Sequence, residues 1–167
     1  TMVEKLLETA TLDSESLDLN KDKINVYDLL SSLVDKHKLQ LESKTIDFTS
    51  SSENIIAKVD VFHFENALNN IIDNAIKYGG DNIYIQLNQK NNSFNISISD
   101  SGNTLTKANQ DKIFEKFYRI TKGNTHDIKG FGIGLYYSKK IIEKHHGTIQ
   151  LELKNNLTSF NISMPNE

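Results

Sequence analysis

The chain has 167 residues, a net charge of −3 and a sequence pI of about 5.9, which suits one domain with an extra element at one end. This balance excludes the basic surface typical of nucleic-acid-binding domains, and the absence of cysteine excludes disulfides, thiolate metal sites and a cysteine nucleophile. No apolar run approaches the roughly 20 residues of a membrane span and no signal peptide is recognisable, so we expect a soluble chain without membrane contact.

The first residues show a helical pattern. Thr1–Leu12 (TMVEKLLETATL) places four apolar side chains on one face, and because a short lone helix is marginal in water we expect this one to pack on a partner. Those side chains are Val3, Leu6, Leu7 and Ala10. Since the chain opens inside this pattern, we expect it to be part of a longer protein. Leu17–Val26 then alternates and predicts a short edge strand.

The segment Val26–Ser43 predicts a second amphipathic helix. Its inward face consists of Val26, Leu29, Leu30, Leu33, Val34 and Leu41. His37 falls near that face, and we interpret it as a boundary residue rather than a ligand. Two short strands are expected next, Thr45–Thr49 and Asn54–Lys58, with a turn in the serine run between them.

A third helix is predicted for Asp60–Gly80. Its buried stripe consists of Leu68, Ile71, Ile72, Ala75 and Ile76. Asn70, Asn74 and Lys77 lie at i, i+4 and i+7 and therefore share another face. Asn is a mediocre helix former. One interpretation is that this face merely reflects a chain rich in Asn and Lys. The other is that it binds ligands, because amide oxygens can coordinate a hard cation such as Mg²⁺ while lysine contacts phosphate.

Strands are predicted for Asn82–Asn88 and Ser93–Ser99, and Asn91-Asn92 between them suits a tight hairpin. Asp100-Ser101-Gly102 follows the second strand. An acidic residue there can accept a hydrogen bond from an exocyclic amine, and the glycine leaves room for a flat ring. The alternative is an ordinary Asp-x-Gly turn.

A short helix is expected to end in IFEKFYR, Ile113–Arg119, and the polar segment Ile120–Lys129 is interpreted as a mobile loop. Gly130–Gly134 (GFGIG) then opens a helix that runs to about His146. Alternate glycines allow close approach of a ligand to the backbone, and a helix N-terminus favours a polyphosphate. The spacing is neither GxGxxG nor GxxxxGK[ST]. A flexible turn is the alternative.

The chain ends in a predicted hairpin, Thr148–Lys154 and Ser159–Pro165, across Asn155-Asn156. Helices group with helices, and the later strands form hairpins. We therefore expect an α+β fold, a two-layer sandwich whose mixed, mostly antiparallel sheet has helices packed on one face.

The order of these motifs resembles the catalytic ATP-binding domain of sensor histidine kinases, a Bergerat fold of the GHKL superfamily, from about Val61 to Pro165. NIIDNAIKY is similar to the family's N box, DSG to its first glycine box, IFEKFYR to its F box and GFGIGL to its second glycine box. Residues 17–58 resemble the lead-in of the same domain, and Thr1–Leu12 resembles the end of a dimerisation and phosphoacceptor domain. We thus expect a remnant of that domain and its linker over residues 1–16 and the ATP-binding domain over residues 17–167.

The resemblance implies roles for individual residues. Asn74 is expected to hold Mg²⁺, Asn70 to line the same pocket and Lys77 to contact phosphate. Tyr78 is expected near the base and sugar, and Asp100 to read the adenine amino group. The full implied ATP-binding set is Asn70, Asn74, Lys77, Tyr78, Asp100, Gly102, Phe117, Arg119, Gly130, Gly132, Gly134 and Leu135.

The implied activity is transfer of the γ-phosphoryl group of ATP, with Mg²⁺, to a histidine on a separate dimerisation domain of the same full-length protein. Asn70, Lys77 and Arg119 are the expected catalytic residues, and Phe114 and Phe117 anchor a lid over residues 120–129. A response regulator is the implied indirect partner. The location implied is cytoplasmic, including the cytoplasmic part of a membrane-anchored sensor.

Two departures from the family pattern stand out. Thr104 replaces a glycine of the first glycine box, and we expect this change to stiffen or reshape the loop beside the adenine and thereby to affect nucleotide affinity. None of the five histidines is followed by the phosphoacceptor pattern, so the substrate histidine is expected elsewhere. His145-His146-Gly147 is expected to be structural. Alternatives are a serine kinase of the anti-sigma type and a non-catalytic nucleotide-responsive module.

Asn70 bears on these alternatives. Related ATPases of the superfamily carry Glu at the corresponding position to activate water, whereas an amide is no general base at neutral pH. The sequence therefore favours a transferase over a dedicated hydrolase.

Overall fold

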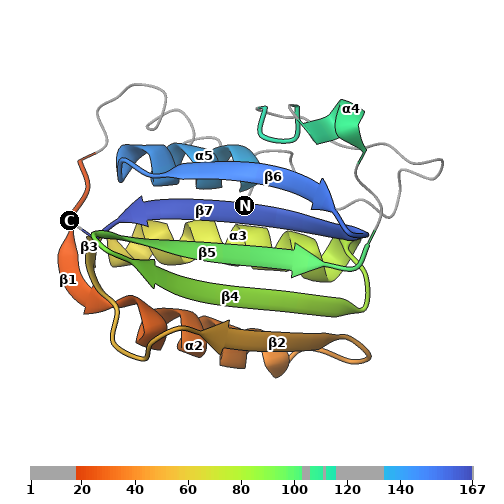
Figure 1. Cartoon of the computed structure of the whole chain (residues 1–167), viewed down its shortest axis with the longest axis horizontal. Coiled ribbons are helices and arrows are strands. Elements are labelled where there is room, and N and C mark those ends of the chain that lie inside the picture. Colours follow the sequence, from red (N-terminus) through yellow and green to blue (C-terminus); the bar gives the residue numbers. More distant parts are fainter. Residues whose placement is uncertain (1–17, 103–105, 111, 116–133, 167) are drawn as a thin grey trace.

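A computed structural model describes residues 18–102, 106–110, 112–115 and 134–166 of the chain. Its main element is a five-stranded mixed sheet in the order β2-β4-β5-β7-β6, in which only the β2–β4 pair is parallel (Figure 1). The strands are β2 (Thr45–Ser50), β4 (Asn82–Lys90), β5 (Ser93–Asp100), β6 (Thr148–Lys154) and β7 (Leu157–Pro165).

Three helices cover one face of this sheet: α2 (Val26–Lys38), α3 (Val61–Tyr78) and α5 (Gly134–Lys144) (Figure 1). A single turn, α4 (Lys107–Gln110), lies near β6, where the Gln110 amide donates to the Leu151 carbonyl at 2.6 Å. The predicted α+β sandwich is confirmed. None of the helices in the described ranges is both long and apolar enough to cross a membrane.

The two remaining strands do not join the main sheet, contrary to the single sheet that we expected. β1 (Asp22–Asn25) and β3 (Ile56–Val59) form a separate antiparallel pair. Each leads directly into a helix of the helical layer, with Asn25 as the N-cap of α2 and Asp60 as the N-cap of α3. This connection holds the pair beside the helices instead of at an edge of the sheet.

The core lies between the helices and the sheet and follows the predicted periodicities. Helix α3 contributes Phe64, Leu68, Ile71, Ile72 and Ala75 to it, all at most 3% exposed. The sheet contributes Ile83, Ile85, Leu87, Phe94, Ile96, Ile98, Leu151, Phe160, Ile162 and Met164. Ile76 is partly buried and packs against the same cluster, so the predicted stripe of the third helix is confirmed.

Helix α2 ends five residues before the predicted boundary at Ser43. After Lys38 the backbone forms tighter turns, with the amide of Gln40 donating to His37 and that of Leu41 donating to Lys38. Leu41 still packs against the core. Leu41 thus keeps the apolar spacing of the helix although the helix has already ended, and this is why the predicted boundary was too late.

The segment around Phe114 also differs from the prediction of a helix ending at Arg119. Within residues 112–115 the chain makes a turn, and the Glu115 amide donates to the Lys112 carbonyl. Ile113 and Phe114 are buried, with the Phe114 ring 5.9 Å from the ring of Phe160. Phe114 thus anchors this turn to the sheet.

The Asn-rich turns lie where they were predicted. Asn91 has a φ of 28°, and Asn155 and Asn156 have φ of 52° and 63°. Positive φ at both central residues of a two-residue hairpin matches the right-handed twist of the flanking strands. Asn tolerates this region better than most residues, which explains its use here.

Candidate functional site

Helix α3 is positioned at its start by a buried cap. The Asp60 carboxylate accepts from the backbone amides of His63 at 3.1 Å and Asn20 at 2.8 Å. The Asp60 amide in turn donates to Nε2 of His145, whose Nδ1 lies 2.8 Å from the Ile141 carbonyl. His145 is 2% exposed, and burial lowers its pKa below the ordinary value. The predicted structural role of His145 is consistent with these contacts.

The middle of α3 meets the start of α5. The Asn70 amide donates to the Gly134 carbonyl at 3.4 Å, and Ser138 donates to the carbonyls of Ala67 and Gly134 at 2.7 and 3.1 Å. The structure thus brings Asn70 and Gly134 together, although 64 positions separate them in the sequence. Because a helix N-terminus presents free N–H groups, this junction is suited to an anion.

The same face of α3 continues toward its C-terminus. Asn74 is half-buried, and its side chain has no hydrogen-bond partner within the described ranges. Tyr78, the last residue of the helix, is also half-buried. Leu135, in the first turn of α5, packs against the core. The amide face and the start of α5 therefore lie on one side of the helical layer.

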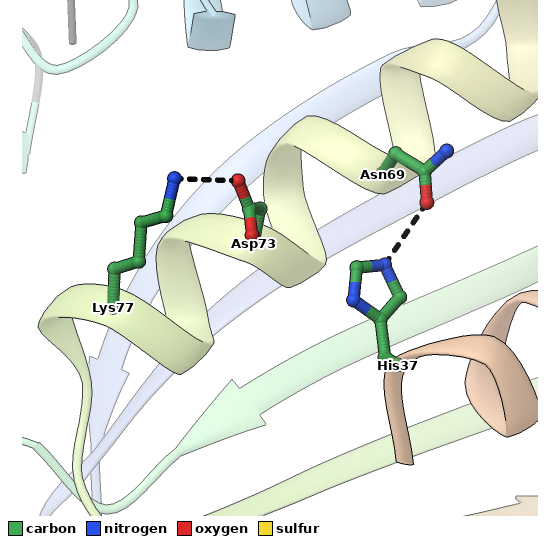
Figure 2. A network of polar contacts seen from close by, with 4 residues as sticks. All are labelled: His37, Asn69, Asp73 and Lys77. Carbon is green, nitrogen blue, oxygen red and sulfur yellow. Dashed lines mark hydrogen bonds and ion pairs between the residues drawn. The ribbon is translucent and has the colours of Figure 1, made fainter. Parts of the chain in front are cut away.

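Lys77 is held by a carboxylate of its own helix. Its Nζ lies 2.9 Å from Oδ2 of Asp73, with both side chains about half-exposed (Figure 2). The hydrogen bond with Asp73 raises the pKa of Lys77. Since exposed i, i+4 pairs are worth only about 0.3–0.5 kcal/mol, this pair restrains the lysine without preventing contact with a phosphate.

One turn earlier, Asn69 links α3 to α2. Its Oδ1 lies 2.9 Å from Nε2 of His37 (Figure 2). Lys36, Gln40 and Asp73 complete an open polar groove between the two helices, which Asn70 also lines. His37 is half-buried and contacts an amide between the two helices, as expected for a residue at the border of the apolar face.

The other end of the site is the Asp100 carboxylate, at the end of β5. The side chain is 4% exposed, and Oδ1 accepts from the backbone amides of Gly102 at 2.8 Å and Gly80 at 3.3 Å. Burial raises the pKa of Asp100, while these two N–H groups and the charge of Lys44 act in the opposite direction. Asp100 is therefore a buried acceptor fixed by backbone amides.

Glycines surround this carboxylate because no side chain fits. A Cβ on Gly79 would lie 2.5 Å from Cγ of Asp100, and one on Gly102 would lie 2.6 Å from the amide nitrogen of Gly80. A Cβ on Gly80 would lie 2.7 Å from the Gly102 nitrogen. The three glycines bring the end of α3 and the DSG segment into direct contact beside Asp100.

Four residues of this region were not singled out by sequence reasoning: Lys44, Gly79, Gly80 and Thr158. The Thr158 hydroxyl donates to the Gly102 carbonyl at 3.1 Å, and Lys44 donates to the carbonyls of Ile76 and Gly79. The glycine pair after the helix was a usable local signal. Lys44 and Thr158 had none, because their partners lie on other elements.

The two ends of the site lie along one helix. From Asn70 to Tyr78, α3 rises about 12 Å at 1.5 Å per residue. A buried carboxylate at the C-terminal end suits an amine of a flat base, and amides beside a helix N-terminus suit phosphate and a hard cation. This arrangement can hold a nucleotide along α3. The predicted residues Phe117, Arg119, Gly130 and Gly132, with the loop 120–129 and Thr104, lie outside the described residues.

A family comparison fits this geometry. Residues 59–167 match the family described as histidine kinase-, DNA gyrase B- and HSP90-like ATPase. The chain belongs to this ATPase family. The predicted resemblance to the ATP-binding domain of sensor histidine kinases is thereby confirmed.

Relatives of this ATPase domain occur in longer sensor proteins. Sensor protein RprX of Bacteroides fragilis is 36% identical, with 98% of this chain and 33% of RprX covered. Sensor protein kinase WalK of Staphylococcus aureus is 30% identical, with 99% of this chain and 41% of WalK covered. The chain thus spans less than half the length of these relatives.

Solved structures share the fold of the ATPase domain. The catalytic domain of histidine kinase ThkA superposes with a TM-score of 0.78 at 24% identity, covering 89% of this chain and 97% of ThkA. Histidine kinase AdeS of Acinetobacter baumannii gives a TM-score of 0.80 at 20% identity, covering 99% and 77%. Full-length ShkA in complex with AMPPNP gives 0.83 at 19% identity, covering 98% and 35%.

Proposed function

We propose that this chain is the catalytic part of a two-component sensor histidine kinase. It binds Mg²⁺ and ATP and transfers the γ-phosphoryl group to a histidine on a separate dimerisation domain of the same full-length protein. The observation that supports this most is the arrangement along α3, with the backbone-fixed carboxylate of Asp100 at one end and Asn70 against the start of α5 at the other. The family membership and the AMPPNP complex of ShkA support the choice of ATP.

The proposed base-recognition end consists of Asp100, Gly102 and Tyr78. Asp100 accepts from the exocyclic amine of adenine, and both of its hydrogen bonds within the described ranges fall on Oδ1. Gly102 leaves room for the ring, and Tyr78 packs near the base and sugar. An amine donor is selected because a second acceptor would leave a buried carboxylate unpaired.

Two sets of residues form the proposed phosphate-binding end of the site. Lys77 and Arg119 are proposed to offset the charge of the phosphates, and Asn70 to line the same pocket. Gly134 and Leu135 begin α5, and the proposed nucleotide-binding set also includes Phe117, Gly130 and Gly132. Asn74 is the proposed Mg²⁺ ligand. Its half-buried amide, without a partner among the described residues, fits a hard cation that prefers oxygen ligands.

In the proposed reaction a histidine nitrogen of the dimerisation domain attacks the γ-phosphorus, the bond to the β–γ bridging oxygen breaks, and ADP leaves. When bound, Mg²⁺ supplies charge neutralisation on the phosphates. Lys77 exchanges its Asp73 partner for phosphate, and Asn70 supplies an amide where a hydrolase would need a base to activate water. The chain's own contribution is therefore positioning and electrostatics.

We place the dimerisation remnant at residues 1–16 and the ATP-binding domain at residues 17–167, in a cytoplasmic setting. A response regulator is the proposed indirect partner. ThkA, which shares the fold with a TM-score of 0.74, has been solved in complex with the response regulator TrrA.

The deciding experiment mixes this chain with a separate dimerisation domain that carries its histidine and adds γ-labelled ATP. We expect Mg²⁺-dependent labelling of that domain, and none when its histidine is replaced. Calorimetry on the chain alone should show tighter ATP binding with Mg²⁺ than for Asn74→Ala. Tight ATP binding without any labelling would favour the non-catalytic module, and labelling of a serine would favour the anti-sigma type of kinase.

A further inference from the structure

Lys44 reaches the end of α3 from a distant part of the chain. It precedes β2, whose first residue Thr45 pairs with Asn82 in β4. The half-buried side chain of Lys44 donates from Nζ to the carbonyl of Ile76 and, at 3.2 Å, to that of Gly79. One ammonium group therefore joins the last turn of the helix to the residue that follows it.

These carbonyls need a partner from outside the helix. The last four carbonyls of an α-helix lack an intrahelical donor, and a positive charge is favoured at this end. Gly79 leaves the helix in an extended conformation, with φ of −88° and ψ of −170°. By bonding on both sides of this change of direction, Lys44 fixes the path by which the chain leaves α3.

That path leads directly to Asp100. A Cβ on Gly79 would lie 2.5 Å from Cγ of Asp100, and the amide of Gly80 donates to Oδ1 of Asp100 at 3.3 Å. The charge of Lys44 also opposes the effect of burial on the pKa of Asp100. Lys44 thus acts on this carboxylate both through Gly79 and Gly80 and through its charge.

We propose that Lys44 is a positioning residue for base recognition, which sets the preference of this site for adenine by holding Gly79 and Gly80 against Asp100. The inference rests on the proposed function, because it assigns Asp100 to the base. An ordinary helix cap would only stabilise the fold. Here the capped carbonyl belongs to a glycine that packs on the recognising carboxylate itself, so the cap and the recognition of the base are coupled.

The test compares the whole chain with Lys44→Met, Lys44→Arg and Lys58→Met. Lys58 is exposed and belongs to β3 of the separate β1–β3 pair. Figure 1 shows β3 at the end of β5 opposite its arrowhead, so replacing Lys58 removes the same charge away from the site. Calorimetry with Mg-ATP and Mg-GTP is run where melting curves show every variant folded. We expect Lys44→Met to bind ATP about tenfold more weakly, with GTP little changed, because two carbonyls lose their donor. Lys44→Arg should restore most of the preference for ATP, and Lys58→Met should keep all of it.

A second measurement does not depend on nucleotide. Carbon-13 NMR titration of the Asp100 carboxyl should show its pKa raised further in Lys44→Met and unchanged in Lys58→Met. Unaltered ATP preference and unaltered titration in Lys44→Met would overturn the inference while leaving the proposed function intact. An equal loss for ATP and GTP would assign Lys44 a merely structural role. A wild-type chain that binds no ATP would overturn the proposed function and base recognition with it, and the titration would then decide only whether Lys44 acts on Asp100.

Discussion

At the scale of single residues, the site combines a fixed acceptor with a movable cation. Asp100 is buried and bonded to two backbone amides, so its geometry is set before any ligand binds. Lys77 is half-exposed, and among the described residues its ion pair is with Asp73 of its own helix. We therefore expect Asp100 to be preorganised for the proposed recognition of the base, whereas Lys77 has to exchange Asp73 for phosphate in the proposed binding mode.

The first prediction concerns Asp100→Asn. Asparagine keeps an oxygen for the amides of Gly80 and Gly102 but presents an NH₂ group in place of the second acceptor. We expect ATP affinity to fall about 10- to 100-fold, as for loss of a hydrogen bond to a charged group. Calorimetry measures this loss, and equal affinity in the variant would remove Asp100 from the site.

Although Asp100→Asn is expected to lose ATP affinity, we expect it to lose no thermal stability at neutral pH. Because the pKa of Asp100 is raised above its ordinary value of 3.8, the folded state holds the proton more tightly than the unfolded state. This contribution to stability is present at low pH and is lost as pH rises through the raised pKa. Asp100→Asn should therefore melt no lower than wild type at pH 7, which differential scanning calorimetry checks.

At the scale of elements, the site depends on how closely two segments approach. The end of α3 and the DSG segment touch backbone to backbone, whereas α3 and α5 meet through side chains. A glycine is required at the first contact because any Cβ would overlap a neighbouring backbone. At the second contact there is room for a methyl group within the described ranges.

The second prediction compares two glycine substitutions. Gly102→Ala puts a methyl group 2.6 Å from the Gly80 nitrogen, so we expect a loss of about 1–3 kcal/mol in the free energy of unfolding. In Gly134→Ala the nearest described atoms, Cβ and Cγ of Asn70, lie at 3.8 Å. Since Ala favours a helix over Gly by up to about 1 kcal/mol, this variant should be at least as stable as wild type. Urea denaturation measures both, and equal destabilisation would contradict the prediction.

The third prediction concerns pH and the joint between α3 and α5. His145 links the two helices as a neutral acceptor, and burial lowers its pKa below 6.5. The unfolded state therefore binds the proton first as pH falls below about 6.5, so this contribution to stability is present at neutral pH and declines on acidification. We expect the free energy of unfolding to fall less between pH 7 and pH 5 in His145→Gln than in wild type.

The neighbouring His146 supplies the control. It is exposed and has a φ of 65°, a conformation that Asn tolerates. His146→Asn should therefore retain the full pH dependence of wild type in the same denaturation series. A steeper acid loss in His145→Gln than in His146→Asn would show that another group is responsible.

At the scale of the whole molecule, the layer of helices brings the residues of the candidate site together. Helix α3 packs against the inner face of the sheet through its apolar stripe and presents its amides on another side, beside α5. Asn70 lines the open polar groove between α2 and α3, and it also contacts Gly134 at the start of α5. Ligand binding to residues from several elements is expected to stabilise all of them together.

The fourth prediction follows from this linkage. At a free Mg-ATP concentration of 100 times its dissociation constant, the free energy of unfolding should rise by about 2.7 kcal/mol. Asp100→Asn, measured at the same concentration, should show a much smaller rise. Denaturation curves with and without nucleotide test this, and an equal rise in both proteins would place the nucleotide elsewhere.

The sequence by itself determined most of the fold and the family. Apolar periodicity located the helix α3 and the strands of the two hairpins within one or two residues, because burial of one face is a local property of the pattern. The order of the four boxes identified the ATPase family, which the comparison confirmed. The roles of Asn74, Lys77 and the other site residues stay predictions, for which the described geometry supplies support.

Only the tertiary structure decided which residues meet. Lys44 and Gly79 lie 35 positions apart, and Asn70 and Gly134 lie 64 apart, so no periodicity relates them. The separate pairing of β1 with β3 was likewise decided by the helices that follow them, since strand pattern does not specify which strand pairs with which. The DSG segment, an ordinary turn in sequence, becomes a buried acceptor site only because α3 ends in two glycines against it.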